Sequence, residues 1–146
     1  MGQRLEGKRA VITGGGRGIG KAIALSYVRE GAQCVVTSRK LDDLEATSEE
    51  GPEGTIKPFV CDVSNDESVA AMAEFVNDEF GGVDIVVNNA GIHAAGRFLD
   101  IDPATYTRLY EVNVVGIVRV SQAFLGGMIE RGRGSIVNIA STAGLF

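Results

Sequence analysis

Short apolar segments alternate with amphipathic segments along most of the chain. The apolar segments are rich in Val and Ile with few polar positions, which is typical of strands buried on both faces of a sheet. The amphipathic segments repeat their apolar residues at helical spacing. This alternation predicts an α/β fold, in which a parallel sheet lies between two layers of helices. The expected strands cover residues 11–13, 32–37, 55–61, 83–87 and 135–139.

Two of the expected helices carry recognisable start signals. Ser64 and Glu67 have the spacing of a capping box, which places a helix start at Ser64. Asp102 followed by Pro103 predicts a second start, because the carboxylate can cap the helix and the missing proline N–H costs nothing there. This second helix is expected to run to about Arg131 with apolar residues on more than one face. Such a helix is expected to be buried by a sheet on one side and by something else on the other.

Right-handed crossovers between parallel strands favour a doubly wound order such as 3-2-1-4-5. Pro58 supports an edge position for the third strand, because proline cannot donate to the hydrogen-bond ladder. The winding direction then switches between strands 1 and 4, so their carboxyl ends should flank a ligand crevice. The glycine-rich turn at 14–20 and the Asn-Asn-Ala-Gly turn at 88–91 both follow these strands. The sequence therefore predicts a binding site between these two turns.

The glycine-rich turn, within TGGGRGIG at 13–20, has the pattern of a dinucleotide-binding turn. Gly14 can adopt backbone angles closed to other residues, Gly18 leaves the backbone open to a pyrophosphate, and Gly20 lets the helix lie close to the strand. The N–H groups and positive dipole end of the helix would then face the anion. The alternative is a tight strand-to-helix turn without a ligand. The residues of this turn expected at the cofactor are Gly14, Gly16, Arg17, Gly18, Ile19 and Gly20.

The end of the second strand bears on which dinucleotide is bound. An acidic residue there would bond the ribose 2′-hydroxyl and repel a 2′-phosphate. The chain has Ser38 followed by Arg39, and a further cation, Arg17, lies in the glycine turn. Because guanidinium groups suit phosphate, these residues favour NADP(H), with NAD(H) as the other candidate. The alternative is a solvated Arg-Lys pair at the start of a helix.

Composition narrows the class of protein. The chain has 146 residues, of which 45% are hydrophobic and 23% charged, and this balance fits one globular domain. A net charge of -5 without a Lys/Arg cluster gives no basic face for nucleic acid. No apolar run is expected to approach the roughly 18 residues of a membrane span, so no membrane partner is expected. Cys34 and Cys61 make neither a disulfide framework nor a metal cluster, which favours a reduced, cytoplasmic setting without a metal.

The order and spacing of the motifs resemble the short-chain dehydrogenase/reductase family, with similarity to its 3-oxoacyl-carrier-protein reductases. The motifs are TGGGRGIG at 13–20, Asp62 after the third strand, NNAG at 88–91, Asn113 within EVNVVG and Ser141 within GSIVNIASTAG. They span essentially the whole chain. The resemblance implies a Rossmann-type, doubly wound parallel sheet and hydride transfer between a nicotinamide and an alcohol/carbonyl pair. It implies an NAD(P)-binding domain over residues 1–146.

The resemblance also implies how further residues meet the cofactor. Asp62 and Val63 would contact the adenine, while Asn89, Ala90 and Gly91 would lie along the ribose side.

Two residues are implied at the reacting groups. By resemblance, Asn113 would hold a water relay and Ser141 would hydrogen-bond the substrate oxygen. From the residues alone, a polar Asn113 within an apolar helix is expected to bond a neighbouring carbonyl or bend the helix. Ser141 lies just past a strand's carboxyl end, and no base that could activate it is near in sequence. A hydrolase nucleophile is therefore not expected.

The family resemblance implies a tyrosine about a dozen residues after Ser141, and a lysine four residues beyond it. Both positions fall past Phe146. We therefore expect the chain to be the cofactor-binding portion of a longer enzyme, truncated before its later strands and inactive alone. A homo-oligomer and a small-molecule carbonyl or alcohol substrate are expected. The alternatives are a non-catalytic nucleotide-binding module and an interaction half-domain that uses its open fifth strand and long helix.

Overall fold

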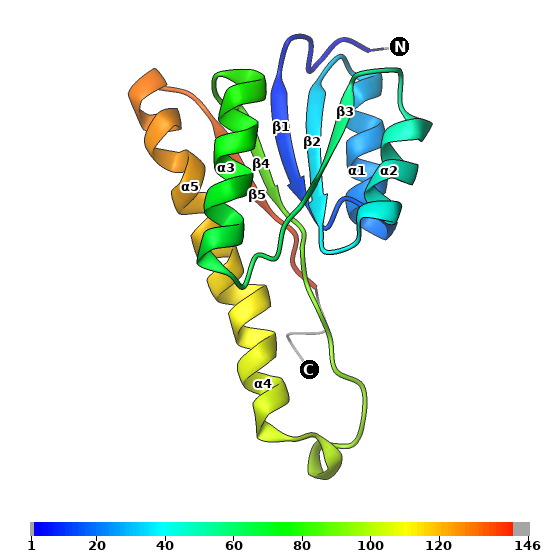
Figure 1. Cartoon of the computed structure of the whole chain (residues 1–146), viewed down its shortest axis with the longest axis vertical. Helices are drawn as coiled ribbons and strands as arrows, with labels where there is room; N and C mark the ends of the chain where they lie inside the picture. The colour runs from blue at the N-terminus through cyan, green and yellow to red at the C-terminus, as the bar shows by residue number, and fades with distance from the viewer. Residues whose placement is uncertain (1, 142–146) are drawn as a thin grey trace.

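A parallel five-stranded sheet in the order β3-β2-β1-β4-β5 forms the centre of the structure, a computed structural model that describes residues 2–141 (Figure 1). This order confirms the predicted doubly wound topology, and the strand bounds agree with the predicted ones to within a few residues. The strands are β1 (Arg9–Thr13), β2 (Gln33–Ser38), β3 (Ile56–Val60), β4 (Ile85–Asn88) and β5 (Ser135–Asn138).

Helices cover both faces of the sheet (Figure 1). Because successive side chains of a strand point to opposite faces, the strands β1, β2, β3 and β4 contribute to both layers. Val11 packs in the cluster under α3 and α5, whereas Ala10 and Ile12 pack in the cluster under α1 and α2. These helices are α1 (Gly18–Arg29), α2 (Leu41–Glu50), α3 (Asp66–Phe80) and α5 (Gly116–Arg131).

The two edges of the sheet differ in character. Pro58 lies in β3, which pairs only with β2 among the described strands, as the sequence predicted. At the other edge, β5 pairs with β4, and Ile136 packs against the core under α3 and α5. Val137, which is in register with Val87, is 38% exposed. The strand β5 is therefore the apolar open edge that the sequence predicted.

The start of α3 differs from the prediction. Asn65, not Ser64, is the N-cap, and its side-chain oxygen accepts from the Ser68 N–H at 2.8 Å. The hydroxyl and N–H of Ser64 instead donate to the carboxylate of Asp62 at 2.6 and 2.9 Å. The predicted capping box of Ser64 and Glu67 is therefore wrong by one residue. Asn caps a helix as well as Ser does, and the nearby carboxylate binds the serine hydroxyl.

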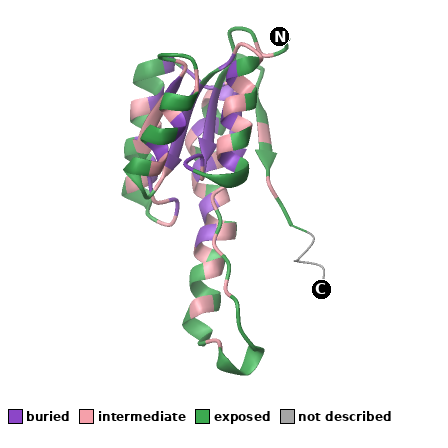
Figure 2. Ribbon diagram, turned by 90° about the vertical axis from the view of Figure 1, so that its right-hand side faces the viewer, coloured by how far each residue is buried: buried purple, intermediate pink, exposed green. Residues whose placement is uncertain are grey.

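The predicted long helix extends over Pro103–Arg131. It begins as expected, because the Asp102 carboxylate accepts from the Ala104 N–H at 2.7 Å. It contains α4 (Pro103–Tyr110) and α5, joined by a π-helical segment, η2 (Glu111–Val115), that the sequence did not predict. Before it, the loop from residue 91 includes the short 3₁₀ helix η1 (Phe98–Asp100). This loop and α4 project away from the sheet, and α4 buries none of its residues (Figure 2).

The expectation that no stretch has the character of a membrane span does not hold for this helix. By length and composition alone, Pro103–Arg131 could cross a membrane, although its apolar residues are interrupted and 28% of the window is buried. Its buried side chains include Val112, Val120, Phe124 and Met128, which recur on one face and join the core shared with α3 and β4. We therefore interpret it as a helix that covers the sheet.

Gly20 and Gly126 offer a matched test of the packing at the start of α1. A Cβ on Gly20 would overlap the carbonyl oxygen of Gly14, whereas one on Gly126 would meet nothing within 4 Å. We expect Gly20→Ala to lower the free energy of unfolding by about 2 kcal/mol, since the backbone must shift. Gly126→Ala should raise it by about 0.5–1 kcal/mol, through helix propensity. Urea unfolding of the full chain measures both, and equal changes would contradict the packing argument.

Candidate functional site

A cavity of about 600 Å³ lies at the carboxyl ends of the central strands, where the winding direction of the sheet switches. All the residues predicted at the cofactor line it except Gly20, which lies beneath the glycine turn. Those that line it are Gly14, Gly16, Arg17, Gly18, Ile19, Ser38, Arg39, Asp62, Val63, Asn89, Ala90 and Gly91. The structure thus brings together segments from four separate parts of the sequence. Asn113 and Ser141 are not in the lining.

The glycine turn has the backbone that its sequence predicted. Gly14 has a φ of 64° and Gly18 a φ of 54°, a region that favours glycine. A Cβ on Gly18 would meet nothing within 4 Å, so its outer side is open. A Cβ on Gly16 would lie 2.9 Å from the Cβ of Asp43, which shows how closely α2 packs on this turn.

The N-terminus of α1 faces the cavity without a side-chain cap. Arg17 is the N-cap residue in an extended conformation, and no side chain accepts a hydrogen bond from the first turn. The first turn also contains no acidic residue. Its N–H groups and the positive end of the helix dipole are therefore left for an anion.

Three cations line the same cavity: Arg17, Arg39 and Lys40. Within the described residues, none of them forms an ion pair. The hydroxyl of Ser38 is bonded to the backbone of Lys40, with both contacts at 3.2 Å, which shapes the turn after β2. Thr37 also lines the cavity, and its buried hydroxyl oxygen has no hydrogen-bond partner within residues 2–141. An uncapped helix start, unpaired cations and an unsatisfied hydroxyl fit a phosphate-bearing nucleotide.

Thr13 ties the two turns of the site together. This residue ends β1 and is buried, and its Oγ1 accepts from the N–H groups of Asn89 and Ala90 at 3.0 and 2.9 Å. In return, the side-chain amide of Asn89 donates to the Gly14 carbonyl at 3.2 Å. The sequence analysis did not identify Thr13 as a site residue. Its only signal is a polar side chain at the last position of an apolar strand.

Thr47 is a second residue that sequence reasoning missed. It is buried on α2, and its hydroxyl lies 3.2 Å from the Gly16 carbonyl and 3.0 Å from the carbonyl of Asp43. The contact anchors the glycine turn to α2. Nothing in the polar sequence of this helix indicates it, because the partner is distant along the chain.

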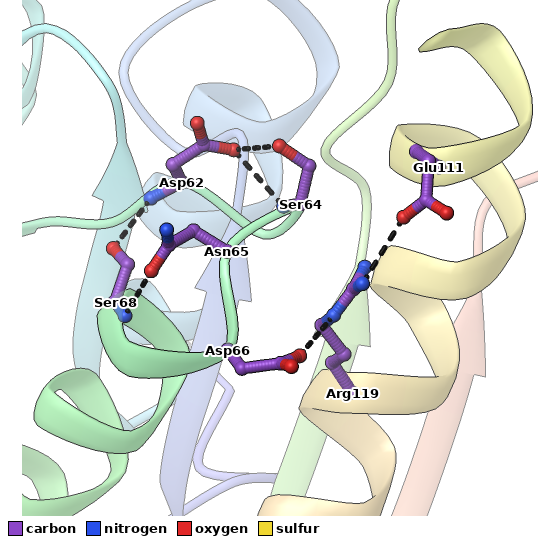
Figure 3. A network of polar contacts seen from close by, with 7 residues as sticks. All are labelled: Asp62, Ser64, Asn65, Asp66, Ser68, Glu111 and Arg119. Atoms are coloured by element: carbon purple, nitrogen blue, oxygen red, sulfur yellow. Dashed lines mark hydrogen bonds and ion pairs between the residues drawn. The ribbon is translucent and has the colours of Figure 1, made fainter. Parts of the chain in front are cut away.

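Asp62 enters the cavity from the segment after β3. One of its carboxylate oxygens accepts both hydrogen bonds from Ser64, and the other makes none of the bonds drawn in Figure 3. The Ser64 hydroxyl is the main reason why the pKa of Asp62 lies below its usual value. The Ser64 N–H and the positive charges of Arg39 and Arg108 act in the same direction, against partial desolvation. Asp62 is therefore held as a carboxylate at neutral pH.

Asn113 uses both halves of its side-chain amide on one residue. Its Oδ1 accepts from the Ile92 N–H at 2.9 Å, and its Nδ2 donates to the Ile92 carbonyl at 2.8 Å. Ile92 follows the Asn-Asn-Ala-Gly turn and lines the cavity. Asn113 therefore bonds a carbonyl on the loop after β4, 21 residues away, and not the neighbouring carbonyl that was expected.

Ser141 lies just past β5 and is exposed, at the same edge of the sheet as the other strand ends. The end of its motif, residues 142–144, lies outside the described residues.

The hydrogen bond between Ser64 and Asp62 can be tested by titration. Ser64→Ala should raise the pKa of Asp62 towards its usual value, because the main stabilising donor is lost. In the native protein the lowered pKa contributes stability that is present above the unfolded-state value and is lost as the pH falls through the folded-state value. Ser64→Ala should reduce this contribution at neutral pH, and the difference should close in acid. Carboxyl-carbon NMR measures the pKa.

Ser68→Ala is the matched control. The Ser68 hydroxyl accepts from the Asp62 N–H at 2.9 Å and does not touch the carboxylate. The pKa of Asp62 should therefore stay depressed in this variant. Equal shifts in the two variants would contradict the assignment to Ser64.

Comparison with known proteins relates this geometry to a family. Residues 8–146 match the family described as short chain dehydrogenase. The uncharacterized oxidoreductase YvrD of Bacillus subtilis is 40% identical over 146 residues, which cover 99% of this chain and 55% of YvrD. The 3-oxoacyl-[acyl-carrier-protein] reductase FabG of Vibrio cholerae is 40% identical over 147 residues, which cover 96% of this chain and 57% of FabG.

A solved structure gives the same relation in three dimensions. The crystal structure of a metagenomic short-chain oxidoreductase in complex with NADP superposes with a TM-score of 0.88 at 38% identity, covering 96% of this chain and 65% of that chain. The chain spans about half the length of the two curated relatives described. The family match covers nearly the whole sequence, and the sheet order is the one expected of it. The chain therefore belongs to the short-chain dehydrogenase family.

Proposed function

We propose that the protein is an NADP(H)-dependent oxidoreductase that acts on an alcohol/carbonyl pair, and that the chain forms its cofactor-binding portion. The observation that carries this proposal is the cavity at the switch point, which is lined by an uncapped helix start and by three cations that form no ion pair with any described residue. Two further facts support it: both curated relatives carry the name of an oxidoreductase or reductase, and a similar solved structure contains NADP.

Different residues of the cavity would bind different parts of the proposed cofactor. The N–H groups at the start of α1 would hold the pyrophosphate, because no side chain competes for them. Arg17 and Arg39 would hold the 2′-phosphate through charge-assisted hydrogen bonds. Asp62 and Val63 would contact the adenine, and the Asn-Asn-Ala-Gly turn would lie along the ribose. Thr13 would act indirectly, by keeping that turn against the glycine turn.

Bound NADPH would supply the hydride for reduction of a carbonyl. Ser141 would hydrogen-bond the substrate oxygen and orient it. Asn113 would hold the loop that forms one wall of the site, and the family resemblance assigns it a water relay as well. The proton for the substrate oxygen would come from a tyrosine beyond residue 146, as that resemblance implies. Because the chain is similar to the reductase FabG, a 3-oxoacyl thioester is the first small-molecule substrate to test.

We also propose a homo-oligomer that packs through the long helix. The supporting observation is a set of large apolar side chains on this helix that remain exposed. They are Tyr106, Tyr110, Val114, Val118, Leu125 and Ile129. Sizing of the purified protein against its monomer mass tests this part of the proposal.

A cytoplasmic location is proposed from the two cysteines. Cys34 and Cys61 are both free and buried. Burial raises the pKa of the Cys34 thiol to about 12 and also raises the pKa of Cys61. Thiols of this kind are inert packing groups, which suits a reducing compartment. Fractionation of cells that express a tagged protein tests the location.

Arg39→Asp tests the cofactor assignment. The substitution removes a proposed phosphate ligand and places a carboxylate where it can bond a ribose 2′-hydroxyl. We expect NADPH affinity to fall roughly 10- to 100-fold, the range of one or two charge-assisted hydrogen bonds, while NADH affinity is kept. Fluorescence titration of the full chain with each dinucleotide measures the ratio.

Arg97→Asp is the matched control. It makes the same change of charge on the projecting loop, at a side chain that is 85% exposed and outside the cavity. The ratio of the two affinities should be unchanged. Equal loss of NADPH and NADH binding in Arg39→Asp would refute the 2′-phosphate assignment. A protein that extends past residue 146 and carries the implied tyrosine and lysine provides the test of catalysis. If it bound NADPH but oxidised it with no carbonyl substrate, a non-catalytic nucleotide-binding module would be favoured.

A further inference from the structure

Arg119 on α5 joins the start of η2, in the same long helix, to the start of α3, which is distant in the sequence (Figure 3). Its Nε donates to Asp66 at the start of α3, and its Nη2 donates to Glu111 at the start of η2, at 3.0 Å. The Arg119 side chain is 20% exposed, compared with 84% for Asp66 and 43% for Glu111. The guanidinium is therefore the covered centre of the group, and the two carboxylates lie at its rim.

The pairing of Glu111 with Arg119 depends on the π segment between them. In a regular α-helix, residues eight apart are offset by about 80°, since eight steps of about 100° exceed two turns by that amount. A π turn contains one residue more than an α turn, so the same eight steps rotate as about seven, within about 20° of two full turns. The π segment thus brings the two side chains onto one face of the helix. Conversely, an ion pair between them favours the π form over the α form.

The same π segment carries Asn113. This side chain reaches the backbone of Ile92 with two hydrogen bonds, and Ile92 lines the cavity. A return of η2 to the α form would rotate Asn113 relative to α5, because one residue would leave the turn. The two bonds to Ile92 require the present direction of the amide.

Asp66 extends the connection to the other wall of the cavity. It follows the turn that contains Asp62 and Ser64, so the bond from Arg119 fixes this turn against the long helix (Figure 3). Arg119 Nη1 is buried and has no hydrogen-bond partner among the described residues. A buried unpaired N–H is unfavourable, and it persists here beside two ion pairs of the same guanidinium.

We propose that Arg119 is a positioning residue for the cofactor site, which holds η2 in its π form through Glu111 and Asp66 and thereby directs Asn113 to Ile92. Its effect on cofactor binding rests on the proposed function, whereas its effect on Ile92 does not. The residue touches neither the cavity nor the proposed reacting groups. It acts through Asn113.

Amide hydrogen exchange at Ile92 in the full chain tests the proposal directly, because the Ile92 N–H donates its hydrogen bond to Asn113 Oδ1. Arg119→Met keeps the apolar part of the side chain and removes the guanidinium. We expect exchange at Ile92 to become roughly tenfold faster, while core amides such as Val36 and Val86 change less than about twofold. The dissociation constant for NADPH should rise roughly three- to tenfold.

Two controls accompany this variant. Arg133→Met removes another arginine, which lies 3.8 Å from Asp84 and far along the chain from η2, and it should leave Ile92 exchange unchanged. Asn113→Ala removes the acceptor itself and gives the upper limit of exchange at Ile92. Glu111→Gln should also speed exchange at Ile92, and the double variant should exchange no faster than Arg119→Met alone, because Glu111 acts on η2 through its ion pair with Arg119.

The outcomes separate this inference from the proposed function. Unchanged exchange at Ile92 in Arg119→Met would overturn the inference, as would an equal rise at all amides, which indicates general destabilisation. If Arg119→Met does not fold, Glu111→Gln decides, since it leaves the bond to Asp66 in place. Failure of the parent chain to bind NADPH would refute the proposed function and leave the exchange test intact.

Discussion

The close approach between the start of α1 and the end of β1 is the constraint on which the site depends. Gly20 lies so near the carbonyl of Gly14 that no side chain fits between them. This contact brings the uncapped N-terminus of α1 to the edge where the sheet changes its winding direction. The hydrogen bonds of Thr13 and Asn89 then fix the second turn against the first. The contact between Gly20 and Gly14 therefore determines both the fold at this edge and the shape of the cavity.

The distribution of charge follows from the same arrangement. The chain carries a net charge of -5, and several of its cations are bound to carboxylates on the outer surface, such as Lys21 to Glu50. The cations around the cavity have no such partners among the described residues. A positive site is thus maintained on an acidic protein by leaving particular arginines unpaired, and net charge alone does not reveal it.

Sequence reasoning succeeded where a constraint is local and failed where it is tertiary. Gly14 could be predicted because its backbone angles exclude other residues, and Pro58 because it cannot occupy a central strand. The cap of α3 was misplaced by one residue because Ser64 and Asn65 are equally good caps, and only the position of Asp62 distinguishes them. Thr47 and the π segment could not be predicted, since their partners come from elsewhere in the chain. The pairing of Asn113 with Ile92 belongs to the same group.

The pairing of β1 with β4 also affects the order in which the parts of the sheet fold. Ala10 lies beside Ile85, so this pairing closes a loop of about 75 residues, whereas β1 and β2 are joined by a much shorter one. Closing the longer loop carries the larger entropic penalty and is expected to be a slower event in folding. The glycine turn follows β1, which can pair early with β2, whereas the Asn-Asn-Ala-Gly turn follows β4, which joins β1 later. A nascent chain would therefore possess the glycine turn before it possesses the cavity, which would be complete only after the two halves of the sheet had met.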